Sequence, residues 1–245
     1  MSRSFNLLSI PLVDIVALAW FFAWWVGYTM VSHKHGQRAP SLLSESSRRR
    51  REWMARIVQR EVRIMDTAIL TNLSSSPTFF ASTSIIIIGG LFALLGTTDK
   101  VSAIVSELPF TAKVSDQNWE IKIIVMIGIF VYAFFKFTWA LRQFNFVSVM
   151  VGAAPPPPEP DESERPDGPL LAQTRRRFID SATLVVSYAG LNYNLGLRSY
   201  YFGIGSTTWF INPYAFMVAT VWVVAILYLR EFRSKTLRAL ASQGE

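Results

Sequence analysis

The composition of this 245-residue chain does not fit an ordinary water-soluble protein. Charged residues make up only 17% of it, against ~25% in soluble domains, while 51% is hydrophobic and the mean hydropathy is +0.30. A nucleic-acid-binding domain can carry the net charge of +7, but it would not also carry apolar runs of roughly 20 residues. The chain has no cysteine, which excludes disulfides, thiolate metal sites and cysteine nucleophiles.

Five apolar runs follow one another along the chain, at residues 13–31, 78–95, 121–141, 197–211 and 213–229. As helices, four of them approach the ~30 Å hydrocarbon thickness of a bilayer, whereas the run at 197–211 is too short alone. We expect that run to end a longer helix that begins within 178–195; a re-entrant segment is the alternative. The sequence therefore predicts an all-α polytopic membrane helix bundle with five transmembrane helices, or four if this run does not cross.

The distribution of basic residues predicts the orientation. In a five-span arrangement, all but four of the 24 Lys and Arg residues fall on one side, and the exceptions are Arg3, Lys100, Lys113 and Lys122. Basic residues concentrate on the cytoplasmic side of membrane proteins. We therefore expect the N-terminus outside and the C-terminus in the cytoplasm, in the cell inner membrane if the source is bacterial. A four-span arrangement would place one basic end on the wrong side.

The chain divides into three parts that we expect to form one membrane domain. Residues 1–151 hold spans one to three, together with a stretch at 50–73 whose apolar residues recur at helical spacing between arginines. We expect 50–73 to be an amphipathic helix on the inner membrane surface. Residues 152–169 form a Pro- and acid-rich, solvated linker to which we assign no folding role. Residues 170–245 hold the long helix with span four, span five and a basic tail.

One face of the third span carries Tyr132, Lys136 and Gln143 at helical spacing. A cation this far from either end costs ~2.5–3.5 kcal/mol unless it is paired or reaches the interface. We expect Lys136 to reach the interface or to pair with a carboxylate such as Asp66 or Asp180. The alternative is a ligand site or ion path that Lys136 shares with Tyr132 and Gln143.

A second pair of charges occupies the opposite side of the membrane. Asp14 is the second residue of the first run and Lys122 the second of the third run, so both lie at the same expected depth. We expect an ion pair at the outer interface, where both groups reach water. A structural tether is the favoured role, and a proton relay is the alternative.

The consecutive arginines Arg48, Arg49, Arg50 and Arg51 are candidates for contacts with anionic lipid headgroups. Each basic residue near such a surface contributes ~1 kcal/mol of attraction. The same four residues also help to fix the topology.

Motifs that carry chemistry are absent from the sequence. It contains no Walker A motif, dinucleotide glycine pattern, HExxH, GxSxG or paired intramembrane carboxylates. The two histidines, His33 and His35, are too few for a metal site without further donors. We expect no catalytic residue, cofactor or metal, and a non-catalytic accessory, scaffold or membrane-organising protein; a channel or secondary transporter is the alternative. The expected partners are the lipid bilayer and either a second copy or another membrane protein, and not nucleic acid.

Three segments resemble the multi-pass membrane proteins grouped as domain of unknown function family 599, found in bacteria and plants. They are FFASTSIIIIGGLFALLG at 79–96, FVYAFFKFTWALRQFNF at 130–146 and LREFRSKTLRAL at 229–240. The resemblance runs from about Asp14 to Leu240 and implies a membrane protein, but no reaction or ligand. Its most recognisable motif contains Lys136, Trp139, Arg142, Gln143 and Asn145, to which it assigns no role.

Overall fold

A computed structural model describes residues 11–36, 41–97, 116–161, 163 and 165–241. No strand occurs among these residues, so the predicted all-α class is confirmed. The helices are α1 (Leu12–Gly36), α2 (Leu42–Ile57), α3 (Ile64–Leu95), α5 (Asp116–Gly152), α6 (Gly168–Ser206), the 3₁₀ turn η3 (Thr207–Phe210), α7 (Pro213–Phe232) and α8 (Lys235–Ala241).

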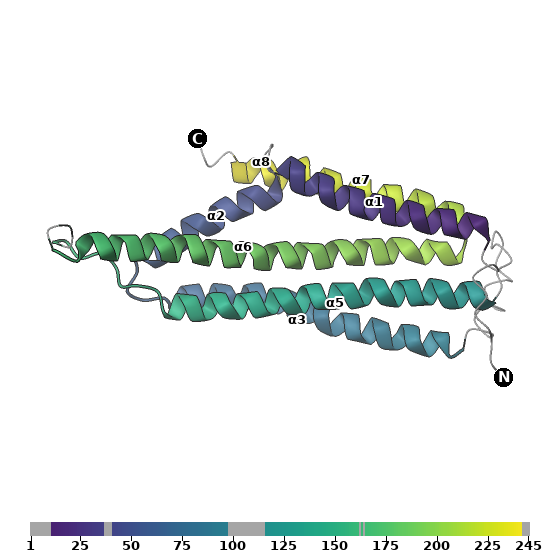
Figure 1. Ribbon diagram of the computed structural model, residues 1–245, viewed down its shortest axis with the longest axis horizontal. Helices are drawn as coiled ribbons and strands as arrows, with labels where there is room; N and C mark the ends of the chain where they lie inside the picture. Colours follow the sequence, from purple (N-terminus) through teal and green to yellow (C-terminus); the bar gives the residue numbers. More distant parts are fainter. Residues whose placement is uncertain (1–10, 37–40, 98–115, 162, 164, 242–245) are drawn as a thin grey trace.

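The long helices lie along one common axis (Figure 1). Helices α5 and α6 form the central antiparallel pair; α3 packs on the other side of α5, and α7 packs against both α6 and α1. Helices α1, α5 and α7 begin, and α3 and α6 end, at one end of the bundle, which we call the Trp209 end. The opposite end, which carries α2, is called the α2 end.

Four helices of the described chain are long and apolar enough to cross a membrane, at Leu12–Ser32, Ile64–Leu95, Asn118–Gly152 and Pro213–Ala241. Helix α6 is not among them, because arginines and an aspartate occupy its first half and asparagine, glycine, tyrosine and serine residues make its second half less apolar. It is nevertheless one continuous helix of 39 residues, about 58 Å long, that runs beside α5. Most of the run at 197–211 thus forms the last part of a long helix, as expected; this helix ends at Ser206, and η3 follows it.

Small residues on α6 allow it to approach α5 closely. A Cβ atom at Gly196 would lie 2.6 Å from the ring of Phe137, and one at Gly203 would lie 2.9 Å from the ring of Phe130. Both rings belong to a cluster of buried apolar side chains that joins α3, α5 and α6. The aromatic side chains of α5 therefore pack directly against the α6 backbone.

The predicted single helix at 50–73 is wrong. Helix α2 ends at Ile57, and the chain turns before α3 begins at Ile64. Buried Asp66 holds this turn, because its carboxylate accepts hydrogen bonds from Trp53 Nε1 at 2.7 Å and from Arg60 Nη1 at 3.0 Å.

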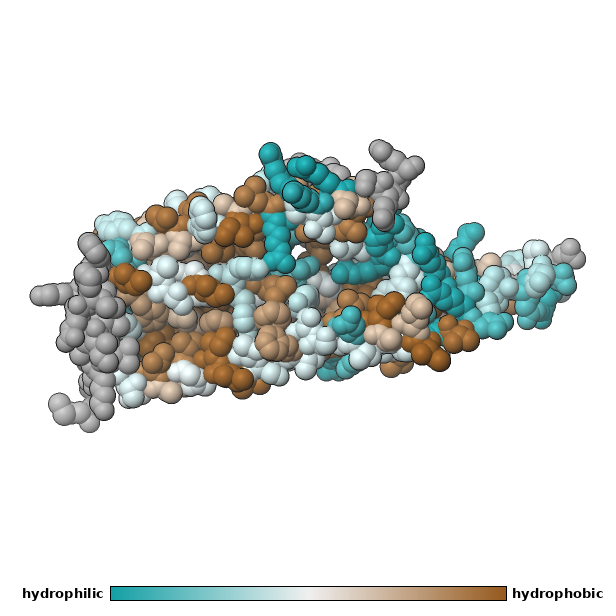
Figure 2. Space-filling view, turned by 180° about the vertical axis from the view of Figure 1, so that it is seen from behind, coloured by the Kyte–Doolittle hydropathy of each residue, from teal (hydrophilic) through white to brown (hydrophobic). Residues whose placement is uncertain are grey.

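The turn also divides the apolar face that was expected to rest on the membrane. Met54 and Ile57 are fully buried against α5 and α6, whereas Ile64 and Met65 are exposed at the start of α3. The apolar side of α2 therefore packs on protein. Hydrophilic residues gather over the half of the molecule that contains the α2 end, and hydrophobic residues predominate toward the other end (Figure 2).

Candidate functional site

A buried charge network joins three elements at the Trp209 end. Lys122 Nζ lies 3.3 Å from Asp14 Oδ1 and donates a hydrogen bond of 2.9 Å to the carbonyl oxygen of Trp209. The indole of Trp209 in turn donates to Asp14 Oδ1 at 2.6 Å. Asp14 and Lys122 are 4% and 1% exposed, so the pair is buried. The expectation that both groups reach water is therefore wrong. Each charge is satisfied inside the protein, which ties α1, α5 and η3 together.

The second lysine of α5 takes part in a polar chain across the α5–α6 contact. Lys136 Nζ donates to Asn192 Oδ1 at 3.3 Å and lies 5.4 Å from the centre of the Tyr132 ring. The amide nitrogen of Asn192 donates to Gln143 Oε1 at 2.9 Å and to the Tyr188 carbonyl at 3.0 Å. The structure therefore joins Lys136 and Gln143 through Asn192, which sequence analysis did not single out, and Tyr132 contacts only Lys136 of this chain of residues.

Neither carboxylate proposed as a partner of Lys136 contacts it. Asp66 binds Arg60 and Trp53, and Asp180 pairs with Arg51 at 2.7 Å. The expected pairing is therefore wrong: Lys136 has a neutral amide and an aromatic ring as its partners.

Tyr132 also lines a mostly apolar groove of about 560 Å³ between α1 and α5. The groove includes the side chains of Trp25, Met30 and Ile129. Tyr132 is 40% exposed, so it stands at the rim of the α5–α6 contact and not inside it.

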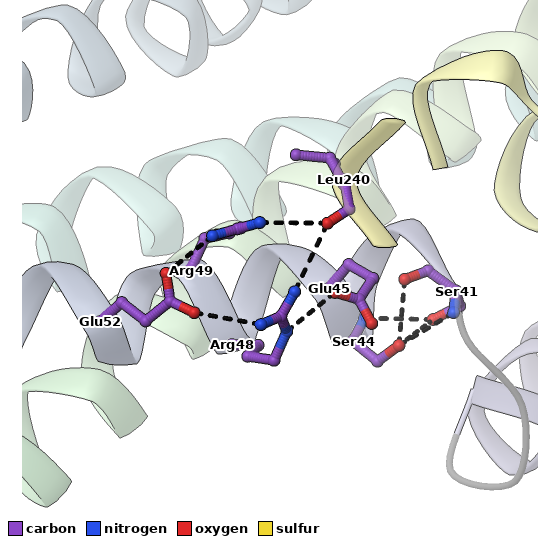
Figure 3. Close-up of polar contacts among 7 residues, drawn as sticks. All are labelled: Ser41, Ser44, Glu45, Arg48, Arg49, Glu52 and Leu240. Atoms are coloured by element: carbon purple, nitrogen blue, oxygen red, sulfur yellow. Dashed lines mark hydrogen bonds and ion pairs between the residues drawn. The ribbon is translucent and has the colours of Figure 1, made fainter. Parts of the chain in front are cut away.

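Three of the four consecutive arginines are engaged by protein groups. Arg48 and Arg49 each bind Glu52 and each donate to the Leu240 carbonyl at the end of α8 (Figure 3). Arg48 also pairs with Glu45 at 3.0 Å. Carbonyls at a helix C-terminus attract cations, so these arginines fasten α8 to α2. Arg51 pairs with Asp180, whereas no ion pair to a described residue holds Arg50, whose Nη1 is buried without a hydrogen-bond partner there.

Arg50 points inward from α2 toward α6. A Cβ atom at Gly190 would lie 2.3 Å from Arg50 Nη2 and 2.6 Å from its Cζ, so the guanidinium packs directly on the Gly190 backbone. Its Nη1 is buried without a hydrogen-bond partner in the described part of the chain. Burial lowers the pKa of Arg50 below its ordinary value, because desolvation disfavours the charged form.

Two cavities with mixed polar and apolar linings adjoin at Ser46 and Asn194, and Arg50 lines the first of them. The first, of about 390 Å³, is lined by Ser46, Arg50, Asn72, Ser76, Tyr193 and Asn194 among others. The second, of about 230 Å³, shares Ser46 and Asn194 with it and adds Arg198, Arg230 and Glu231. Three arginines and one glutamate thus surround the combined space, which makes it electropositive.

The glutamate of the second cavity is already occupied. Glu231 accepts a hydrogen bond from the Leu43 amide at the start of α2 and lies 3.8 Å from Arg198. Arg198 also donates to Ser32 Oγ at 2.8 Å and faces the Tyr28 ring. These contacts tie α1, α2, α6 and α7 together on one side of the cavity pair.

The linker at 152–169 has structural contacts that the sequence did not reveal. Arg63 donates to the carbonyls of Ala154 and Pro155 at 3.0 and 2.7 Å, and Arg175 donates to the Pro156 carbonyl at 2.8 Å. Proline has no amide hydrogen, but its carbonyl still accepts. The linker is therefore held against the starts of α3 and α6.

The hydroxyl groups at the start of the second apolar run mostly bond to their own helix. Ser74 binds the Leu70 carbonyl, and Thr78 binds the Ser74 carbonyl. Ser84 differs, because its hydroxyl also lies 2.9 Å from the hydroxyl of Tyr200 on α6. Most of these hydroxyls therefore satisfy their donors locally and do not line an open path.

No group of three or more metal-ligating side chains occurs in the part of the chain that the structure describes. The side chains of His33 and His35 lie outside the described residues.

Comparison with known proteins agrees with the resemblance carried by the three segments. A family model described as "Protein of unknown function, DUF599" matches residues 16–236, which is most of the chain. The chain belongs to the DUF599 family. No curated protein and no solved structure matches it.

The DUF599 segment at 130–146 lies on α5 along the α3 and α6 contacts. Within it, Phe137 and Gln143 are buried toward α6, whereas Trp139, Arg142 and Asn145 are exposed. The most recognisable DUF599 segment of this chain thus contributes mainly to helix packing and to the polar chain with Asn192.

Proposed function

We propose that the protein crosses the membrane five times, with the Trp209 end outside and the α2 end in the cytoplasm. Four sufficiently apolar helices and the antiparallel course of α6 beside α5 support this arrangement. The basic residues support the orientation: of the four cations on the outer side, Lys122 is neutralised by Asp14.

Within this topology, the protein acts as a non-catalytic accessory, scaffold or membrane-organising protein. One observation carries this proposal: the charged and polar residues of the spans act as ties between helices. Lys122 ties α5 to α1 and η3, Asn192 joins α6 to Lys136 and Gln143, and Arg198 joins α6 to α1. A bundle whose helices are joined by such polar contacts suits a platform for other membrane components.

The second candidate is a channel or transporter that uses the polar face of α5. The electropositive cavity pair at the α2 end favours it, because it resembles the inward mouth of a conduit. Apolar packing between the two lysines of α5 argues against a continuous path. Ile129 is buried there against Phe21 and Phe202, and the Phe202 ring stacks on Trp25 at 4.9 Å.

Mass spectrometry of the protein purified in mild detergent tests the proposal. The accessory or scaffold function predicts a second membrane protein at a fixed stoichiometry. When the purification is repeated with the tag on that partner, the present protein must co-purify with it at the same stoichiometry. A homo-oligomer with no such partner would contradict this function and favour transport.

A further inference from the structure

The four arginines of the run 48–51 differ in what they contact. Arg48, Arg49 and Arg51 bind carboxylates on the protein itself. Arg50 instead lies between α2 and α6, against Gly190, with its Nη1 buried and unbonded in the described chain. A buried guanidinium nitrogen without an acceptor is costly, so an acceptor that reaches Nη1 would be favoured.

The cavity beside Arg50 is suited to an anion. Serine, asparagine and tyrosine side chains supply neutral polar groups around it, and none of the described residues that line it is acidic. Its volume of about 390 Å³ falls within the ~300–1,000 Å³ range of small-molecule sites. Arg198 and Arg230 in the adjoining cavity add positive charge.

In the proposed topology, the cavity lies near the polar headgroup layer. Asn72 and Ser76 line it from α3, just before the apolar run at 78–95 begins. Ser76 thus precedes the run by about 3 Å along the helix and Asn72 by about 9 Å. The interfacial layer beyond the hydrocarbon is roughly 5–8 Å thick on each side, so Ser76 falls within it and Asn72 at its aqueous edge. A phosphate group can therefore enter from a lipid or from the aqueous phase.

We propose that the cavity between α2, α3 and α6 binds one phosphate-type oxyanion, with Arg50 as its ion-pair partner and Asn72 and Ser76 as hydrogen-bonding groups. Gly190 is a positioning residue, because only a residue without a Cβ leaves room for the guanidinium. This inference goes beyond the proposed function, since it names a ligand class and holds whether or not a protein partner is found.

The test uses the full-length protein, delipidated in detergent, and measures its thermal unfolding midpoint. One arm adds phosphatidylglycerol, with a phosphate-free glycolipid as the reference. A second arm adds inorganic phosphate in the detergent alone, with chloride at equal ionic strength as the reference. A saturable rise of the midpoint in the first arm alone identifies a lipid headgroup, and a rise in the second identifies a free anion; either result supports the site.

Two variants separate the site from general surface charge. Arg50→Gln removes the cation, and Gly190→Ala keeps the cation but displaces it; each should weaken the apparent phosphate affinity about 10-fold or more. Arg177→Gln, an exposed residue of α6, removes the same charge and should leave the affinity unchanged. Gly89→Ala is the matched glycine control, because nothing lies within 4 Å of a Cβ atom there.

The result that overturns the proposal is a wild-type protein that responds to neither phosphate source beyond its reference. Equal losses in Arg50→Gln and Arg177→Gln would overturn it too, since they would reveal only diffuse surface attraction. If Arg50→Gln does not fold, Gly190→Ala and Arg50→Lys decide the matter: the site requires Gly190→Ala to lose affinity and Arg50→Lys to retain part of it.

Discussion

Asp14 and Lys122, near the starts of the first and third spans, form an ion pair at 3.3 Å with both side chains buried. The Trp209 indole and carbonyl complete the arrangement, so neither charge is left unsatisfied. This contact joins α1, α5 and η3, which are far apart in the sequence, at the Trp209 end of the bundle.

Removing one member of this pair should destabilise the protein strongly. Asp14→Asn leaves the Lys122 ammonium buried without its counter-charge, a loss of ~3–5 kcal/mol in comparable buried pairs. The free energy of unfolding, measured in detergent, reports the change. The double variant Asp14→Asn with Lys122→Met should recover much of the loss; a single variant as stable as the wild type would contradict the tether role.

Replacing a buried aspartate near α2 should lower the free energy of unfolding more than replacing an exposed one. Asp66→Ala removes a fully buried carboxylate that holds Trp53 and Arg60 at the α2–α3 turn, and we expect it to cost ~2–4 kcal/mol. Asp180→Ala breaks a pair with Arg51 in which both side chains are more than half exposed, which contributes ~0–1 kcal/mol. Chemical unfolding of both variants measures the difference, and equal losses would refute our account of the turn.

The close approach of α5 and α6 predicts a size limit at Gly196. Gly196→Ala places a methyl group 2.6 Å from the Phe137 ring, and such overpacking typically costs ~1–3 kcal/mol. The same substitution at Gly128, with nothing within 4 Å of its Cβ position, should cost nothing measurable. Thermal unfolding midpoints of the two variants, measured side by side, provide the comparison.

The proposed topology can be tested by cysteine labelling without background, because the natural chain has no cysteine. Single cysteines at Gly152 and at the C-terminus should resist a membrane-impermeant maleimide in intact cells and react after permeabilisation. A cysteine at Thr97 should react in intact cells. Labelling of Gly152 and the C-terminus from opposite sides would show that the number of spans is wrong.

Sequence patterns predicted the local features of the fold but not the contacts between distant segments. Apolar runs and helical spacing were enough to predict the all-α bundle and to place Tyr132, Lys136 and Gln143 on one face. The partner Asn192 lies on another helix, and no periodicity indicates which residue it faces.

The α2–α3 turn was missed for a related reason. Apolar spacing continues through 50–73, while the turn depends on the buried contacts of Asp66. Arg50 likewise looks like its neighbours in the sequence. Its contact with Gly190 on α6 distinguishes Arg50 from its neighbours, and only the tertiary structure shows this contact.

Ion flux through proteoliposomes, compared between the wild type, Lys136→Gln and Lys136→Met, tests most directly the claim that the polar residues tie helices together. The account predicts no flux of common cations, anions or small acids above protein-free vesicles for any of the three proteins. It also predicts that Lys136→Met is less stable than Lys136→Gln, because Met leaves the buried Asn192 Oδ1 without its donor whereas Gln can still donate. A wild-type flux that both variants lose while folding normally would contradict the account and assign Lys136 to a conduit.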